Sequence, residues 1–382
     1  MPEDKANPDS RVSGEDGRRI LRRDPNPHLF RPIRFRSVEL RNRLMLSPMC
    51  QYSATDGIAN DWHFVHLGAR AVGGAGIVCT EAVHVSPRAR ITRHDLGLWN
   101  DRQRDALQRI AAFVAAQGAV PAIQLGHAGR KASVGRPWEG SKPVPEAAGG
   151  WRTVSCSEQA YASGWPTPEA LSEADIADEM SAMADAARRA RDAGFRILEI
   201  HAAHGYLIHQ FYSPLSNTRQ DGYGGSFDNR IRFLLETIDA VRAEWPAELP
   251  LFVRLSATDW VEGGWELADT VRLAQLLKAR GDVDLIDCSS GGNDPRQQIP
   301  IHPGYQVPLA REVRQAAGIA TGAVGLLNAP DLVESVIANG SADLVLIGRG
   351  LLADPHWPLK AANALKAQNV SWPVQYERSN IF

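Results

Sequence analysis

Short apolar segments alternate with longer amphipathic segments along the chain from about residue 43 onward. The short segments have the length of strands, and some, such as Ile77-Val78-Cys79, are apolar throughout, which indicates burial on both faces. The long segments repeat apolar residues every three or four positions, as amphipathic helices do. The predicted strands are 43–49, 76–83, 119–125, 196–201, 249–255, 285–289, 320–324 and 344–347. The predicted helices are 62–72, 101–117, 173–193, 227–243, 267–280, 307–317, 329–338 and 356–366.

Strict alternation of strands and helices predicts an α/β fold with a parallel sheet, either an open doubly wound sheet or a closed (β/α)8 TIM barrel. The unusual polar residues favour the single barrel, because each falls at or just past the carboxyl end of a different strand. In a barrel these ends surround one mouth, where active sites form, whereas in an open sheet they lie along an edge. The residues are Cys50, Glu81, Gln124, His201, Arg254, Ser289, Gly325 and Arg349.

Two segments fall outside this alternation. Residues 28–43 contain the pieces 33–35 and 38–40, which predict a hairpin that closes the bottom of the barrel. Residues 126–172 form a long loop after the third strand, and its aromatic content fits a lid over the substrate as well as it fits a packed surface excursion. The aromatic residues are Trp138, Trp151, Tyr161 and Trp165.

The composition is that of an ordinary globular protein. The 382 residues are 44% hydrophobic and 23% charged, and the net charge is 42 − 44 = −2, which argues against a nucleic-acid partner. No apolar stretch approaches the roughly 20 residues that span a membrane. Residues 1–27 are charged and lack an apolar run, so we expect a disordered tail ahead of one domain at 28–382.

The four cysteines are scattered along the chain. Cys50, Cys79, Cys156 and Cys288 form no CxxC pair, which argues against an iron–sulfur cluster or a structural zinc site. Scattered cysteines in a chain of this size indicate a reducing compartment, so we expect a cytoplasmic protein.

The segment His201-Ala202-Ala203-His204-Gly205-Tyr206 carries the clearest chemistry. Two imidazoles three residues apart share a side if the strand end turns into helix, and they can then donate two N–H bonds to one substrate oxygen. Tyr206 can supply a proton. Metal binding is the rival interpretation, but no third ligand accompanies the pair, and we expect no metal.

Glycines at the ends of strands seven and eight predict a phosphate site. The turns around Gly325 and Gly348-Arg349 let the backbone approach a phosphate that Arg349 can pair with. Gln124 can hydrogen-bond an imide edge, and Arg254 offers a permanent positive charge that stabilises a reduced flavin. Together these groups describe FMN.

With these residues, the chain resembles the Old Yellow Enzyme family of FMN-dependent ene-reductases, also called NADPH dehydrogenases. The resemblance extends from about residue 28 to the C-terminus. Cysteine at position 50 resembles the thermophilic-like, cysteine-containing subgroup. The motifs that carry the resemblance are 47–52 (SPMCQY), 124–131 (QLGHAGRK), 201–207 (HAAHGYL), 213–217 (SPLSN), 221–226 (DGYGGS) and 347–349 (IGR).

The resemblance implies a two-step cycle in which NADPH or NADH reduces FMN and the flavin passes hydride to the β-carbon of an activated alkene. His201 and His204 would bind the activating oxygen, Tyr206 would be the proton donor and Tyr52 would line the substrate pocket. The residues implied to contact FMN are Ser47, Pro48, Met49, Cys50, Ala82, Gln124, Arg254, Gly348 and Arg349.

In this subgroup an arginine near the C-terminus reaches the neighbouring subunit's active site. Arg378, within Gln375-Tyr376-Glu377-Arg378, matches it and implies a homodimer or homotetramer, whereas a frayed terminus is the alternative. The loop at 126–172 follows no assignable family pattern, so it leaves the substrate preference open.

Three other functions remain as alternatives. Dienoyl-CoA reductases and amine dehydrogenases are related but add an iron–sulfur cluster and a second nucleotide domain, for which the chain offers neither clustered cysteines nor length. A metal-dependent barrel hydrolase would use His201 and His204 as ligands. A flavin-binding barrel without catalysis would be yellow but not reducible by NAD(P)H.

Overall fold

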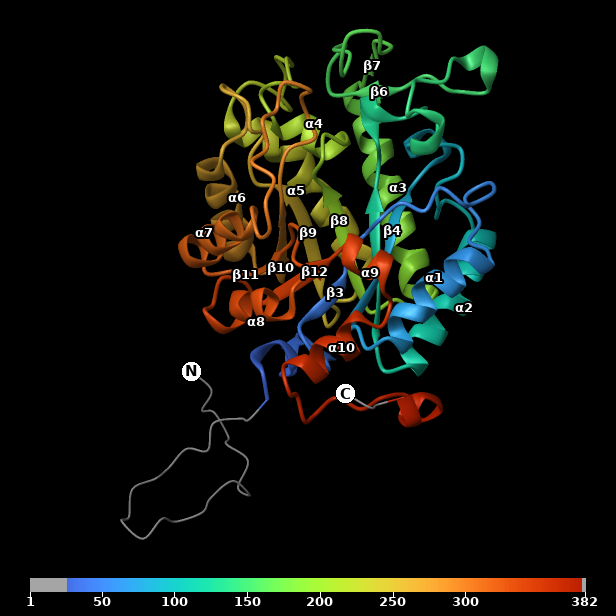
Figure 1. The fold of residues 1–382 in the computed structure, drawn as a ribbon. Helices are drawn as coiled ribbons and strands as arrows, with labels where there is room; N and C mark the ends of the chain where they lie inside the picture. Colours follow the sequence, from blue (N-terminus) through green and yellow to red (C-terminus); the bar gives the residue numbers. More distant parts are fainter. Residues whose placement is uncertain (1–25, 380–382) are drawn as a thin grey trace.

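The computed structural model describes residues 26–379, and at its centre eight parallel strands form a closed barrel (Figure 1). The closed order β3-β4-β5-β8-β9-β10-β11-β12 confirms the predicted TIM barrel and excludes the open sheet. The tail expected at 1–27 lies outside the described residues except for its last two. The barrel strands are β3 Leu44–Leu46, β4 Ile77–His84, β5 Val120–Gly126, β8 Ile197–Ala202, β9 Leu251–Ser256, β10 Leu285–Ser289, β11 Ala320–Ala323 and β12 Leu344–Ile347.

Helices surround the barrel, and their caps explain where several of them begin. Ser172 accepts the backbone N–H of Asp175 at the start of α3, and the Asp175 carboxylate accepts the backbone N–H of Ser172 in return. The eight predicted helices are present, and two short ones, α4 and α9, are additional. The helices are α1 Asp61–Val72, α2 Asp101–Ala116, α3 Glu173–Asp192, α4 Leu207–Tyr212, α5 Phe227–Glu244, α6 Leu267–Arg280, α7 Val307–Ala317, α8 Pro330–Ala338, α9 Arg349–Ala353 and α10 Trp357–Ala364.

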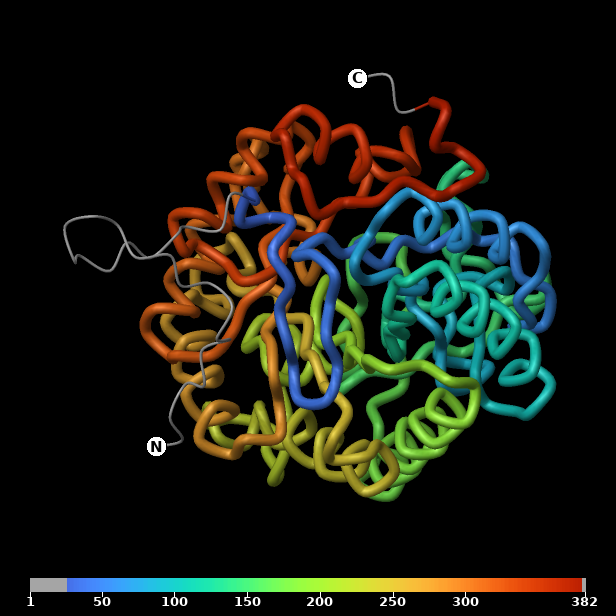
Figure 2. Tube along the Cα trace, turned by 90° about the horizontal axis from the view of Figure 1, so that it is seen from below, coloured from blue at the N-terminus to red at the C-terminus, as the bar shows by residue number. Residues whose placement is uncertain are grey.

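The predicted hairpin is confirmed and crosses the amino-terminal end of the barrel. Strands β1 (Ile33–Phe35) and β2 (Val38–Leu40) pair antiparallel, and Figure 2 shows this blue hairpin lying across the barrel seen from below. The ring of Phe35 packs edge-on against Phe252 of β9, with 5.3 Å between the ring centres. The bottom is therefore plugged by apolar side chains, and the opposite end remains for chemistry.

The long loop after β5 is packed at its base and exposed near its tip. At the base, β6 (Val154–Ser155) pairs with β7 (Glu169–Ala170), and the Trp151 indole donates a 2.9 Å hydrogen bond to the carbonyl of Arg88. Trp138 is 64% exposed. The loop thus combines both predicted forms, a packed excursion that extends into an exposed arm beside the mouth (Figure 1).

Candidate active site

The strand ends meet at the mouth as predicted. A Cβ atom added to Gly348, after β12, would lie 3.4 Å from Met49 Sδ and 4.0 Å from Ser47 Cβ, so the segment after β3 lies in van der Waals range of this turn. A cavity of about 170 Å³ opens beside it. Predicted phosphate and ring residues line this cavity together, namely Arg254, Gly325, Gly348 and Arg349, and the strand-end residue Ser289 lines it too.

The two histidines converge at the mouth, but not on a helix as the sequence suggested. His201 is the penultimate residue of β8, whereas His204 lies in a turn with a left-handed backbone, φ 61°. His204 Nδ1 lies 3.4 Å from His201 Nε2, and the rings are nearly perpendicular. The left-handed turn, and not helical periodicity, therefore brings the two ring nitrogens to one point.

Hydrogen bonds to the other ring nitrogens favour a donating pair. The backbone N–H of Ala203 donates to His201 Nδ1 at 3.3 Å, which leaves the ring proton on Nε2. His204 Nε2 lies 2.7 Å from Ser289 Oγ, and a hydrogen bond donated by that hydroxyl would place the His204 proton on Nδ1. Burial lowers the pKa of both imidazoles well below the usual value, and Arg254 lowers it further. The pair is therefore neutral and can present two N–H groups to one oxygen.

Tyr206 lies beside this pair and retains its proton. Its ring is perpendicular to that of His201, with 5.0 Å between centres, and burial raises the pKa of the phenol well above its ordinary value. Lys131, from the loop after β5, lies 5.1 Å from the centre of the Tyr206 ring and donates 2.8 Å hydrogen bonds to the carbonyls of His204 and Gly292. Burial lowers the pKa of Lys131 to about 7. Lys131 thus fixes the turn that carries the predicted catalytic side chains.

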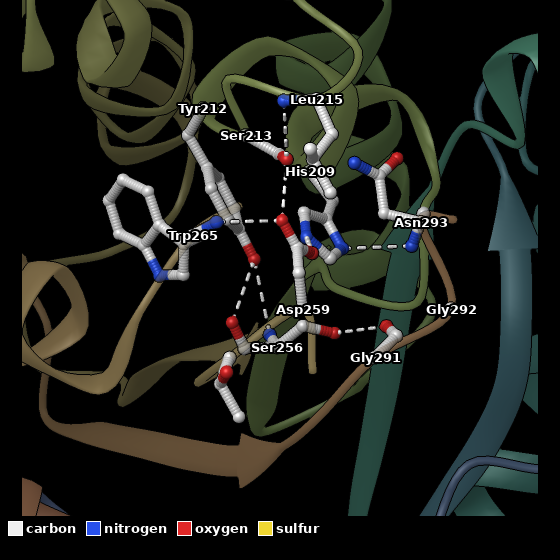
Figure 3. A network of polar contacts seen from close by, with 12 residues as sticks. His209, Tyr212, Ser213, Leu215, Ser256, Asp259, Trp265, Gly291, Gly292 and Asn293 are labelled. Carbon is white, nitrogen blue, oxygen red and sulfur yellow. Dashed lines mark hydrogen bonds and ion pairs between the residues drawn. The ribbon is translucent and has the colours of Figure 1, made fainter. Parts of the chain in front are cut away.

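A buried network beneath the 204–206 turn holds it from the other side (Figure 3). The Gly205 N–H donates to His209 Nδ1 at 2.9 Å, so His209 Nε2 carries the proton and donates to Asp259 at 2.8 Å. Ser213 donates to the second Asp259 oxygen at 2.6 Å, and the backbone N–H of Trp265 reaches the same oxygen at 2.8 Å. The turn is therefore tied to a fully buried hydrogen-bonded pair, His209 and Asp259, between α4 and the loop after β9.

Cys50 and Tyr52 follow β3 at the same mouth. Burial raises the pKa of the Cys50 thiol well above its usual value, and Asp95 and Glu81 raise it further, so the sulfur is a thiol and not a thiolate. Glu81, within β4, accepts the backbone N–H of Gln51 at 2.9 Å and so holds this segment. Tyr52 meets Trp138 edge-on, with 5.9 Å between ring centres, which places the exposed arm of the long loop against the predicted substrate wall.

The remaining predicted ring residues lie deeper in the barrel. Ala82 and Gln124 are paired neighbours on β4 and β5, and the Gln124 amide donates to Glu199 at 2.7 Å. Arg254 on β9 adjoins His201 in register and lies 2.9 Å from Asp287. Sequence reasoning did not assign roles to Lys131, Glu199, Asp259 or Asp287. An acidic residue inside an otherwise apolar strand was the available signal for Glu199 and Asp287.

The site fits FMN on three observations. The cavity between β11 and β12 combines glycine backbone with Arg349 and Arg254, which suits a phosphate and the polar edge of a ring. Buried polar atoms of the barrel interior have no hydrogen-bond partner, Thr321 Oγ1 among them. Met49 and Ser47 lie close to Gly348, which lines that cavity. These residues could therefore hold the cofactor.

Arg378 does not join the site of its own chain. It lies in the exposed segment Val374–Ser379, at the end of the barrel opposite the mouth (Figure 1). Within residues 26–379, no group of three or more His, Cys, Asp or Glu is arranged to hold a metal ion, and no helix there is long and apolar enough to cross a membrane.

Comparisons with known proteins agree with this geometry. Residues 28–368 match the NADH:flavin oxidoreductase / NADH oxidase family. NADPH dehydrogenase of Geobacillus thermodenitrificans is 46% identical over 355 residues, covering 92% of this chain and 98% of the relative, and that of Bacillus subtilis is 44% identical with the same coverages. The solved structure of a morphinone reductase superposes with a TM-score of 0.75 at 28% identity, covering 89% of this chain and 90% of that one.

Fold, site and sequence similarity converge, because the family match spans the barrel and the mouth fits FMN. The chain belongs to the NADH:flavin oxidoreductase / NADH oxidase family, that is, the Old Yellow Enzyme family of FMN-dependent NAD(P)H oxidoreductases.

Proposed function

We propose that the protein is an ene-reductase that reduces activated alkenes with NADPH or NADH. Bound FMN supplies the chemistry by accepting hydride from the nicotinamide and transferring it to the β-carbon of the alkene. The observation that carries the proposal is the convergence of His201 and His204, both neutral, beside a protonated Tyr206. Enones, maleimides and nitroalkenes all present an oxygen that such a pair can bind.

Each protein group has one task in this proposal. His201 Nε2–H and His204 Nδ1–H donate to the activating oxygen and draw charge away from the alkene. Tyr206 holds its proton at the phenol oxygen and donates it to the α-carbon. Ser289 and the backbone of Ala203 select the histidine tautomers. Tyr52 lines the substrate space, while Cys50 borders the flavin as a neutral thiol.

The alkene class can be tested by reoxidation of the NADPH-reduced protein with a panel of compounds. We expect rapid reoxidation by alkenes that bear a carbonyl or nitro group and none by matched unactivated alkenes of the same size. Equal rates for both sets would show that the histidine pair does not polarise the substrate.

Replacing Tyr206 by Phe is expected to slow alkene reduction by about 10²-fold, the low end of the range for a positioned acid. The buried ring is retained and only the proton is lost, so flavin reduction by NADPH should change little. Stopped-flow measurement of the two half-reactions separates these effects. An unchanged oxidative half-reaction would assign the proton to another donor, and Tyr161→Phe, the second ring that Lys131 contacts, is the control.

We also propose that the functional unit is a homodimer or homotetramer in which Arg378 reaches the neighbouring subunit's mouth. The support is the exposure of Val374–Ser379 and its distance from its own mouth (Figure 1). Arg378→Ala is then expected to raise the substrate KM several-fold without lowering Tm, because an exposed side chain contributes little to stability. Glu377→Ala, on the same segment, is the control. An unchanged KM would remove Arg378 from the site.

A cytoplasmic location fits the same proposal. Cys50, Cys79, Cys156 and Cys288 are all free in the structure, as expected of a protein kept in a reducing compartment.

A further inference from the structure

A cluster of charged side chains beneath the mouth joins Arg254, an expected flavin contact, to two carboxyl groups that have no role in the chemistry proposed above. It consists of Arg254 on β9, Asp287 on β10 and Glu199 on β8, which point into the barrel interior. The two carboxyl side chains are fully buried, and Arg254 is 5% exposed. Burial of three ionisable groups in a barrel core is costly unless their charges balance.

Arg254 and Asp287 form an ion pair between neighbouring strands. They are direct partners in the β9–β10 register, and Arg254 Nε lies 2.9 Å from Asp287 Oδ2. Neither atom is aligned as a hydrogen bond, so the contact is electrostatic. Arg254, Gly348 and Arg349 line the same cavity, and Arg254 is also the register partner of His201 on the neighbouring strand β8. The guanidinium therefore lies between the predicted phosphate site and the histidine pair.

The charge states of the two carboxyl groups differ. Burial raises the pKa of Glu199, Asp287 raises it further and Arg254 opposes the shift, which favours the neutral acid at Glu199. Burial also raises the pKa of Asp287 and Arg254 lowers it, and the guanidinium nitrogen 2.9 Å away favours the ionised form of Asp287. The cluster is then one cation balanced by one anion, with a neutral carboxyl beside them.

We propose that Asp287 sets the reduction potential of the bound flavin by partly neutralising Arg254, a positioning and tuning role for a residue that does not touch substrate. The inference rests on the proposed placement of the flavin ring against Arg254. Reduction leaves negative charge on the ring edge, and a cation there stabilises it. An anion 2.9 Å from that cation weakens the effect. The flavin is thereby kept reducing enough to pass hydride on.

The test is the two-electron midpoint potential of Asp287→Asn and Asp287→Ser, measured anaerobically at pH 7 by titration with a chemical reductant. Both variants remove the anion and leave Arg254 unbalanced. We expect a rise of at least about 30 mV, which is a tenfold change for a two-electron couple. Sulfite, which adds to oxidised flavin and creates the same ring charge, should bind about tenfold more tightly. Glu199→Gln removes no charge at pH 7 and is the matched control, with an expected potential near that of the wild type.

Each outcome decides the question. A higher potential in either aspartate variant, with Glu199→Gln unchanged, supports the proposal. An unchanged or lower potential in flavin-loaded variants overturns it. Loss of FMN from both variants would also overturn it, because Asp287 would then serve binding and not tuning. The titration does not use NADPH or an alkene, so a wild-type protein that fails to turn over would count against the proposed function alone.

Discussion

His201→Ala is expected to slow flavin reoxidation by an enone by about 10²- to 10³-fold, the effect of removing one oxyanion-type donor. His201 Nε2 is one of two ring nitrogens that meet at 3.4 Å, and its proton is directed there by the backbone N–H of Ala203. His204 alone cannot supply both donors. The same variant should bind a phenol more weakly, because a phenolate oxygen uses the same two N–H groups.

Two further measurements make this prediction decisive. The flavin content of His201→Ala should equal that of the wild type, since the imidazole is placed on the substrate side; loss of FMN would mean a structural role. His201→Asn retains a donor and should recover part of the lost rate. If His201→Ala reoxidised as fast as the wild type, the histidine pair would have no part in activating the alkene.

Asp259→Ala is expected to lower the free energy of unfolding by about 3–5 kcal/mol, because each buried donor that loses its acceptor costs about 1–3 kcal/mol. Asp259 accepts hydrogen bonds from His209, Ser213 and the backbone of Trp265, all of them buried, and none would find a replacement. Urea unfolding measures the loss. Asp228→Ala removes an exposed ion pair with Arg272 and should cost under about 1 kcal/mol.

The same variant has a predictable pH dependence. Burial raises the pKa of Asp259, but contacts with His209 and Ser213 outweigh it and hold the pKa below its ordinary value of 3.8. A depressed carboxyl pKa gives stability that is complete above the unfolded value and lost as the pH falls through the folded one. The stability difference between Asp259→Ala and the wild type should therefore be constant near pH 6 and shrink below pH 3.8. A stability difference that does not change as the pH falls would show that Asp259 acts only by packing.

The barrel could be predicted because its strands and helices are each encoded by patterns within a short stretch of sequence. Strands such as Leu344–Ile347 are apolar throughout, and α3 begins at a serine cap whose partner is three residues on. The strand-end residues could be predicted to meet because a closed parallel barrel leaves no other place for them. Most of the expected flavin contacts, among them Ser47, Met49 and Ala82, came instead from the resemblance to the family.

The support of the site could not be predicted, because it depends on contacts between distant residues. His209 and Asp259 are 50 positions apart, and no pattern links them before the fold does. The left-handed backbone of His204 is stabilised by Lys131, 73 positions away, and opposes the helical turn that the His201–His204 spacing suggested. Short α4 was missed because six residues carry too little periodicity to detect.

The long loop shows the same limit. Its aromatic residues fitted either a lid over the substrate or a packed surface excursion. The structure shows that Trp151 contacts the loop after β4, whereas Trp138 packs against Tyr52. One aromatic residue thus anchors the loop, and another borders the predicted substrate wall. Composition alone does not separate these roles, because both positions are tryptophan.

The proposed cycle requires NAD(P)H and the alkene to reach the same flavin in turn, so we expect both to use the one mouth, and anaerobic stopped-flow with a phenol tests this most directly. The protein should be yellow, its flavin absorption should bleach with NADPH and return with an enone, and the phenol should compete in both half-reactions. Inhibition of the enone step alone, with NADPH reduction unaffected by saturating phenol, would contradict a shared mouth.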